Sequence, residues 1–394
     1  MKVTNTRLTG FLATTFPKIA FGIGILGAAF LAFFFKQDPH HFYFAYLTVF
    51  MIFLTLTLGS LFFVLIQHLV RAGWSIGFKR IAETLMSNSG LMALLFIPII
   101  FGIPHLYHWS NAAEVAKDPL LNSKHAFLNI PFFKVRALFY FGIWITLSRV
   151  FYKKSTEQDS SGDPENTVKM QKYSTFGILL FALSITFACI DWVMSLTPHW
   201  YSTMIGVYFF AGSVVVALST ISCIAQILRS QGYLKEVLTV EHFHEIGKLL
   251  YGFNVFWAYI AFSQYFLIWY ANIPEEIAFY LEHFKGTWNT VAIFLVLGHF
   301  VGPFILFMSR HAKRNLPFHF AITLWFIFMQ MVDMYWFVMP NFNINGFHIG
   351  GVELAALSRI GGLYLGTFFT RLSKQALYPI QDPRISESIH LENL

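Results

Sequence analysis

The sequence predicts an all-α integral membrane protein with about ten transmembrane helices. Hydrophobic residues make up 56% of the 394 residues and charged residues only 12%, which is about half the charged share of ordinary soluble domains. The apolar residues also gather into runs close to the roughly 20 residues that a helix needs to cross a bilayer. We therefore expect a single membrane domain over residues 1–394, with no soluble domain inserted in it.

Ten apolar runs follow one another, and each predicts one span. The first, from Pro17 to Lys36, lacks the small-residue cleavage site of a signal peptide and is long enough to span. The expected spans are residues 17–36, 43–67, 82–103, 134–151, 173–194, 199–228, 244–271, 286–308, 317–339 and 347–370. Short loops favour antiparallel neighbours, so spans two to five and six to nine are expected to form two four-helix bundles, with spans one and ten as peripheral helices.

The basic residues predict which helix ends face the cytoplasm. Most of the 27 lysine and arginine residues fall near the chain termini and in every second loop, which lie on one side when the number of spans is even. The positive-inside rule then places both termini, including the tail of residues 371–394, in the cytoplasm. The formal net charge of +7 thus reflects topology, with anionic lipids as its partner, and indicates no nucleic acid.

Two segments outside the spans are long enough to comment on. Residues 152–172 are rich in Ser, Asp, Glu and Lys, which predicts a solvated cytoplasmic linker. Residues 104–133 form the longest outer loop, and its aromatic and histidine residues suit a loop that lies on the outer face. The tail contains Pro379 and Pro383 and is expected to be extended.

The connection between spans five and six carries the first candidate site. Asp191 lies in the last turn of span five, and Thr197 followed by Pro198 predicts the start of span six, with His199 in its first turn. The helix dipoles and the low dielectric favour the neutral forms of both groups, which suits a site that accepts protons from a quinol. Alternatively, Asp191 caps the turn or pairs with Arg136 at the outer end of span four.

A second candidate group lies inside the spans. Asp333 and Glu353 fall about six residues from the outer ends of spans nine and ten, at a similar depth of roughly 9 Å. Arg359 and His299 lie nearer the middle of the membrane, where an unpaired charge costs several kcal/mol, so Arg359 should pair with Glu353 or Asp333. This group is either the middle of a proton path or a buried ion pair that fixes the packing.

Further proton-path candidates lie where two spans begin on the cytoplasmic side. They are Glu83 at the start of span three, and His242, His244 and Glu245 at the start of span seven. A polar helix start at an interface is ordinary, so a structural role stays open. His242 and His244 are two positions apart and point to different faces, whereas a chelating pair needs a spacing of four. We therefore expect no metal site.

The cysteine count limits the redox cofactors that this chain can hold alone. Cys189 and Cys223 are the only cysteines, which excludes a c-type haem motif and a cluster held by four thiolates. A b-type haem needs facing histidines in mid-membrane, and only His299 is well placed. We expect no cofactor bound by this chain alone, with quinone or quinol as the ligand to consider.

Five stretches, taken in order, resemble one family across nearly the whole chain. They are RIAETLMSNSGLMALLFIPIIFGIPHLYHW, LLNSKHAFLNIPFFKVRALFYFGIW, DWVMSLTPHWYSTMIGVYFFAGS, AFSQYFLIWYANIPEE and DMYWFVMP. They are similar to the smaller of the two related quinone-binding-type membrane subunits of bacterial alternative complex III. That subunit belongs with the ten-helix membrane anchors of the NrfD-like and polysulfide-reductase-like type.

The resemblance implies an integral subunit of a quinol:electron-acceptor oxidoreductase complex in the bacterial inner membrane. Electrons would flow through partner subunits, which carry haem c and iron–sulfur clusters, while this chain contributes a quinol-proximal site and a proton path. The implied partners are a larger homologous membrane subunit, a periplasmic iron–sulfur subunit, c-type cytochrome subunits, small membrane anchors and a terminal oxidase.

Two other functions stay open at the level of the sequence. One is a purely structural scaffold subunit of the same complex. The other is a secondary transporter, which should carry broken helices at corresponding places in its two halves. Gly302 and Pro303 offer one such break in span eight, and no clear counterpart exists.

Overall fold

The structure is a computed structural model that describes residues 6–343 and 346–392. The remaining residues, Lys2 among them, lie outside the described part. Within that part every regular element is a helix, and the single β-type pairing is an isolated bridge between Arg7 and Ala376. The predicted all-α class is therefore confirmed.

Several helices have the length and composition to cross a membrane. Seven do so in the described part of the chain: α1 (Phe11–Gln37), α2 (Pro39–Leu69), α8 (Ile130–Ser161), α9 (Glu165–Trp192) with η2 (Met194–Leu196), α10 (Ile205–Ser230), α13 (Trp288–Leu295) with η3 (Val296–Val301) and α14 (Gly302–Leu306), and α16 (Leu316–Val338) with η4 (Met339–Asn341). The chain is thus a multi-pass membrane protein.

Three further predicted spans are less apolar or less regular. The third is bent: α3 (Ile76–Met86) and α4 (Ser89–Leu95) meet α5 (Ile97–Leu106) at 54°. Pro98 stands at the start of α5, where its ring removes a backbone donor and breaks the helix. The long helices α11 (Val240–Ala271) and α17 (Gly351–Leu372) carry more polar residues and are not among the seven. The count of ten stays a prediction.

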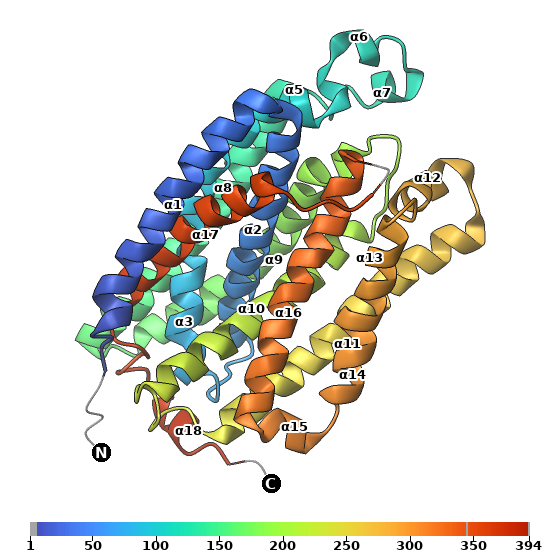
Figure 1. Cartoon of the computed structure of the whole chain (residues 1–394). Coiled ribbons are helices and arrows are strands. Elements are labelled where there is room, and N and C mark those ends of the chain that lie inside the picture. Colours follow the sequence, from blue (N-terminus) through green and yellow to red (C-terminus); the bar gives the residue numbers. More distant parts are fainter. Residues whose placement is uncertain (1–5, 344–345, 393–394) are drawn as a thin grey trace.

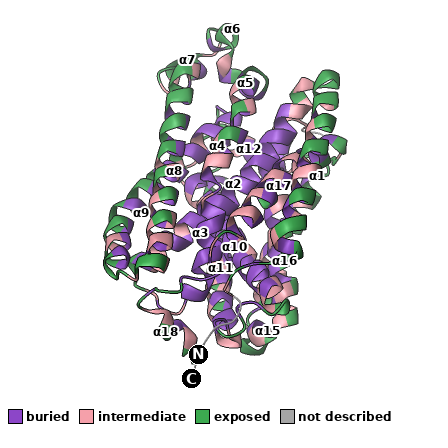
Figure 2. Cartoon of the chain, turned by 90° about the vertical axis from the view of Figure 1, so that its left-hand side faces the viewer, coloured by how far each residue is buried: buried purple, intermediate pink, exposed green. Residues whose placement is uncertain are grey.

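The helices α2 and α10 form the centre of the protein. Figure 2 shows buried residues concentrated on these inner helices, whereas α1, α8 and α9 expose their outward faces. The two central helices approach closely at Gly59, where a Cβ atom would lie 1.9 Å from the backbone oxygen of Ser213. Only glycine fits there, because any side chain would meet the facing backbone.

Helix α1 lies beside α17 at the edge of the molecule (Figure 1). Small residues permit this contact: a Cβ atom on Gly27 would lie 2.5 Å from the backbone nitrogen of Arg359, and one on Gly362 would lie 2.5 Å from the backbone oxygen of Ala20. Close approach of backbones through small residues is the usual way in which membrane helices associate.

Short helices mark the two ends of the molecule. One end carries η1 (His108–Ser110), α6 (Ala112–Val115), α7 (Pro119–Ser123) and α12 (Pro274–His283), and the other carries α15 (Arg310–Arg314) and α18 (Ile385–Ile389) (Figure 1). We call these the outer end and the inner end, after the sides that the basic residues predict. The start of α1 and the end of α17 both lie at the inner end.

Two predictions about the polar segments at the inner end are wrong. Residues 152–172 are not a linker, because α8 continues to Ser161 and α9 starts at Glu165, with a turn at Gly162 (φ +66°) between them. The tail is not extended either, since it folds across the inner end and buries Asp382, whose carboxylate lies 3.0 Å from Lys79 Nζ.

Candidate functional site

Asp191 is held in a buried ion pair at the outer end. Arg136, on α8, donates from Nε and Nη2 to the two carboxylate oxygens over 2.7 and 2.8 Å, and the Tyr140 hydroxyl donates to Oδ2 over 2.8 Å. All three side chains are buried. A bidentate guanidinium–carboxylate pair is the geometry of two charged partners. The alternative that Asp191 pairs with Arg136 is therefore confirmed.

The rest of the Arg136 guanidinium is also enclosed. Its Nη1 donates to the backbone oxygen of Phe127 over 2.8 Å, and the rings of Phe127 and Phe132 lie 3.9 and 4.3 Å from its central carbon. Since Arg136 sits near the start of α8 and Asp191 near the end of α9, the pair ties the outer ends of these helices together. It leaves no free carboxylate oxygen for a ligand.

His199 does not join Asp191. Its Nε2 lies 2.5 Å from Oδ2 of Asp118, in the outer loop, and the imidazole is half exposed. The hydrogen bond from His199 lowers the pKa of Asp118, and backbone donors at the start of α7 act in the same direction. The prediction that Asp191 and His199 form one site is therefore wrong. Asp191 pairs with Arg136, and His199 pairs with Asp118.

The local reason lies in where α10 begins. The prediction that Thr197 caps a helix is wrong: α10 starts at Ile205, and Thr197 instead donates from its hydroxyl to Asn341 over 2.7 Å. His199 thus stands in an irregular segment that runs over the outer surface, within reach of the loop that carries Asp118.

Glu353 lies at the start of α17 and bonds away from Asp333. Its Oε1 is 2.7 Å from Nε2 of His41, at the start of α2, and its Oε2 accepts the backbone N–H of Gly350 over 2.8 Å. It thus caps its own helix and links it to α2. Glu353 and Asp333, which the sequence places at a similar depth, therefore have different partners.

Arg359 does not form the expected ion pair with a buried carboxylate. It makes no salt bridge with any described carboxylate, and its one hydrogen bond runs 3.3 Å to the backbone oxygen of Gly24 on α1. The predicted ion pair with Glu353 or Asp333 is therefore wrong. The reason is the tight α1–α17 contact, which directs this part of α17 toward α1.

Asp333 lies fully buried among α10, α11 and α16. Its Oδ1 accepts a short hydrogen bond from the hydroxyl of Tyr208. Trp257 interacts with the same carboxylate, although its indole N–H makes no well-formed hydrogen bond. The ring of His299 lies against that of Trp257, with the centroids 3.8 Å apart and the planes tilted by 37°. These contacts bring two of the predicted residues, Asp333 and His299, into one cluster.

The cluster continues one helical turn toward the inner end. Gln330 stands three residues before Asp333 on α16 and lies against Gly212, and Asn254 stands three residues before Trp257 on α11. We call the following residues the polar string: Tyr208, Asn254, Trp257, His299, Gln330 and Asp333. Four of its members, Tyr208, Asn254, Trp257 and Gln330, lie outside the sites that the sequence predicted.

Hydrogen-bonding capacity in the polar string is largely unused. Asn254, His299 and Gln330 each have both polar side-chain atoms buried without a hydrogen-bond partner among residues 6–343 and 346–392. An unpaired buried polar group costs on the order of 1–3 kcal/mol. Because polar residues inside a membrane bundle are costly, these three unpaired residues on neighbouring helices are candidates for a functional site.

A π-helix places His299 in this cluster. Pro303 has no N–H to bond the carbonyl of residue 299, and the chain forms η3 over Val296–Val301 in place of a regular α-helix. Trp325 donates to the backbone oxygen of Gly298 over 2.7 Å, which satisfies one carbonyl there. π-Bulges of this kind are frequent at functional sites.

Polar contacts extend from the polar string toward both ends. On the outer side, Gln264 donates to the Tyr280 hydroxyl over 3.1 Å and accepts from the partly exposed Ser202 over 2.9 Å. On the inner side, His319 lies 2.9 Å from the Ser222 hydroxyl and 3.0 Å from the backbone oxygen of Lys313.

The contact between His319 and Ser222 is separated from the polar string by several turns of α16. His319 and Asp333 share one face of α16, about 21 Å apart along the helix. The ring of Phe326 occupies the turn between them and lies 6.0 Å from His299.

Glu83 belongs to a separate charged network at the inner end. Its Oε2 lies 3.2 Å from Arg80 Nη1 and accepts the Ser155 hydroxyl over 2.9 Å, and Arg80 also reaches Asp159 over 2.5 Å. Burial raises the pKa of Asp382, but Lys79 and the Arg384 backbone outweigh it and leave the value below the ordinary one. This network fixes α3, α8 and the tail to one another.

Two of the three candidate residues at the start of α11 have structural partners. His242 caps its own helix with Thr239 and lies 3.0 Å from the Ser388 hydroxyl of the tail, and Glu245 lies 2.6 Å from Lys248. His244 is buried, and its Nδ1 has no hydrogen-bond partner in the described part of the chain. Within the described residues no group of three His, Cys, Asp or Glu side chains is arranged to hold a metal ion.

Comparisons with known proteins identify no family for this chain. No protein-family model matches the chain, and no curated protein matches it either.

Proposed function

We propose that this chain carries protons through the membrane along the polar string, as a subunit of a quinol-oxidising respiratory complex. The observation that supports this role is the set of buried, unpaired polar atoms on Asn254, His299 and Gln330 beside the Asp333 carboxylate. Water molecules that bond to these atoms would satisfy them, and a chain of water, imidazole and carboxylate groups is a proton relay.

The proposed path has a defined order. A proton passes between the outer surface and Asp333 through Ser202, Gln264 and the two tyrosines Tyr280 and Tyr208, whose hydroxyls lie in that direction. It continues over the unpaired atoms of the polar string to the inner pair of Ser222 and His319. The ring of Phe326 lies between the two halves of this path, and rotation of its side chain would connect them.

For the architecture we propose ten crossings. The bent segment from α3 to α5 counts as the eighth crossing, and α11 and α17, with 32 and 22 residues, are each long enough to be the remaining two. The helices α2 to α9 then form one four-helix bundle, α10 to α16 form the other, and α1 and α17 flank them. An even number of crossings puts both termini on one side of the membrane, and the basic residues on that side support the cytoplasm of a bacterial cell.

The wider setting of the proposal rests on the five sequence stretches that resemble alternative complex III. In that setting, electrons move through haem c and iron–sulfur groups of partner subunits, and this chain binds no redox cofactor of its own. The partners are the larger homologous membrane subunit, the periplasmic iron–sulfur subunit, the cytochromes, the small anchors and a terminal oxidase. Copurification of the native chain with haem-bearing proteins tests this, and isolation as a stable protein alone would contradict it.

A quinol-proximal role is best assigned to the exposed outer pair. His199 and Asp118 reach the surface, and an imidazole that is hydrogen-bonded to a carboxylate is a good proton acceptor, whereas the Asp191 carboxylate is fully bonded. In the assembled complex, His199→Ala should lower quinol oxidation while the subunits stay together. Unchanged turnover with intact assembly would leave this pair without a quinol role.

The experiment for the proton path is a flux measurement in vesicles. The complex is reconstituted with a pH-sensitive dye inside, and quinol oxidation is started from outside. Asp333→Asn should lower proton movement about tenfold or more, and Asp333→Glu should restore part of it, because only a group that titrates supports a relay. Glu353→Gln, at the start of α17, serves as the matched control and should leave proton movement unchanged.

A secondary transporter is the second candidate, and the breaks in two helices favour it. The α4–α5 bend of 54° and the π-helix η3 interrupt the third and eighth predicted spans. These spans are not at equivalent places in the two proposed bundles, which is unlike inverted repeats. Solute-driven proton uptake into vesicles that contain this chain alone would establish the transporter.

A further inference from the structure

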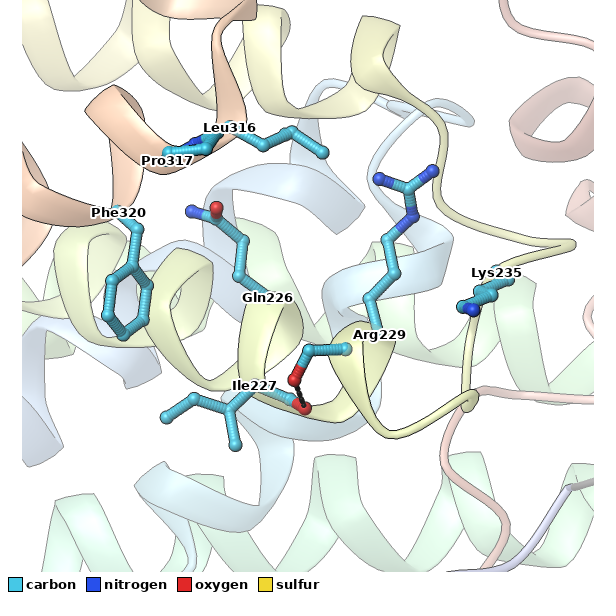
Figure 3. A pocket seen from close by; sticks show the side chains of 8 residues that line it. Gln226, Ile227, Arg229, Lys235, Leu316, Pro317 and Phe320 are labelled. Atoms are coloured by element: carbon cyan, nitrogen blue, oxygen red, sulfur yellow. Dashed lines mark hydrogen bonds between the residues drawn. The ribbon is translucent and has the colours of Figure 1, made fainter.

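A pocket with a basic wall opens at the inner end, between the end of α10 and the start of α16. It encloses about 500 Å³. Figure 3 shows Gln226 and Arg229 extending from α10 toward the first turn of α16, with Lys235 on the loop that follows α10. The opposite wall is apolar, and it is formed by Leu316, Pro317 and Phe320.

The polar wall offers hydrogen-bond donors without acceptors. Arg229 Nε and Gln226 Nε2 are buried and have no hydrogen-bond partner in the part of the chain that the structure describes. No acidic residue lines the pocket, and neither Arg229 nor Lys235 takes part in a salt bridge there. By contrast, Arg314 at the same end is bonded by both carboxylate oxygens of Glu241.

The apolar wall continues onto the surface that faces the membrane. Phe320 lies on the same face of α16 as Leu324, one turn further into the membrane, and Leu324 is 46% exposed. A ligand that fills the pocket therefore meets cations and amide donors at one side and hydrocarbon at the other. These two requirements describe an amphiphile with an anionic head.

We propose that this pocket binds the head group of an anionic phospholipid from the inner leaflet. The phosphodiester accepts hydrogen bonds from Arg229 and Gln226 and is paired with the Lys235 ammonium, while one acyl chain follows Phe320 and Leu324. Basic pockets between membrane helices are suited to such head groups. This site is separate from the polar string, and its occupation does not depend on proton movement.

The test is native mass spectrometry of the purified full chain with phosphatidylglycerol or phosphatidylcholine added. The wild type should retain one phosphatidylglycerol in preference to phosphatidylcholine. In the double variant Arg229→Met, Lys235→Met the affinity for phosphatidylglycerol should fall about five-fold for each cation removed. Arg229→Lys should keep most of it, and Lys374→Met, an exposed cation on the tail at the same end, is the matched control.

Any of three results would overturn the proposal. One is a double variant that keeps its helix content by circular dichroism and retains phosphatidylglycerol as well as the Lys374→Met control does. The second is displacement of the lipid by inorganic phosphate, and the third is equal binding of glycerol phosphate. Either of these last results would assign the pocket to a soluble phosphate compound, since the acyl chain would then contribute nothing.

Discussion

At the residue scale, the role of an ionisable side chain depends on which partner completes its hydrogen bonds. Asp191 and Asp333 are both buried carboxylates near the outer ends of helices. The first has a bidentate arginine and a tyrosine, so it holds two helices together. The second has one tyrosine and lies beside residues whose polar atoms are unpaired, so it alone is placed to exchange protons.

A first prediction separates the two outer ion pairs. Asp191→Asn should lower the free energy of unfolding by about 3–5 kcal/mol, because Arg136 would stay buried without its counter-charge. Asp118→Asn is the matched control at the exposed pair with His199 and should change stability little. Thermal denaturation in detergent measures both. Equal losses in the two variants would contradict the assignment of Asp191 to a buried pair.

A second prediction concerns His283, which lies buried in α12 with its Nδ1 2.8 Å from the backbone oxygen of Phe279. Burial lowers its pKa from 6.5 to about 4. Between these two values the unfolded chain binds more protons than the folded one, so stability is complete above 6.5 and falls as the pH is lowered toward 4. The loss amounts to as much as about 3 kcal/mol.

The measurement is the unfolding midpoint of wild type and His283→Gln between about pH 7 and about pH 4.5. The wild type should lose stability over this range, and the variant should lose less because the group that titrates has been removed. Parallel curves would show that protonation of His283 does not limit stability.

At the element scale, apolar periodicity predicts that helices exist but not where polar contacts end them. The spans around α2, α9 and α16 agree with the sequence, because long apolar runs leave few other structures in a membrane. The start of α10 and the extent of α8 were missed. Thr197 bonds to Asn341, which is far along the chain, and so does not cap α10. The polar end of α8, up to Ser161, stays helical where Asp159 bonds to Arg80 and to the tail.

The candidate site was predictable in part for the same reason. Asp333 and His299 stand out as ionisable residues within apolar runs, and His319, Gln330 and Asp333 repeat at helical spacing on α16. That spacing was the signal for the missed Gln330. The pairing of His199 with Asp118 and of Glu353 with His41 joins residues 81 and 312 positions apart, and no local pattern in one sequence indicates such partners.

A third prediction tests the contact between the central helices. Gly59→Ala should lower the free energy of unfolding by about 1–3 kcal/mol, because the added methyl group would meet the Ser213 backbone and force α2 and α10 apart. Gly252→Ala, on α11, is the matched control, since nothing lies within 4 Å of its added carbon. It should be neutral or slightly stabilising. Stability that is unchanged in Gly59→Ala would contradict the tight central crossing.

At the scale of the whole molecule, the two proposed bundles differ in how their polar groups are satisfied. The half with α8 and α9 is fixed by ion pairs at both ends, Arg136 with Asp191 at the outer end and Arg80 with Asp159 at the inner end. The half with α10, α11 and α16 contains the polar string. In the proposed function the first half serves as the frame and the second half supplies the groups for proton transfer, because Asp333 and the polar string lie there.

The central claim is that Asp333 changes its protonation as protons cross the membrane. Infrared difference spectroscopy of the reconstituted protein after a pH step tests it most directly. We expect a carboxyl band that is absent in Asp333→Asn and shifted in Tyr208→Phe, because Tyr208→Phe removes the hydrogen bond to the carboxylate. A difference spectrum that is the same in wild type and Asp333→Asn would contradict the claim.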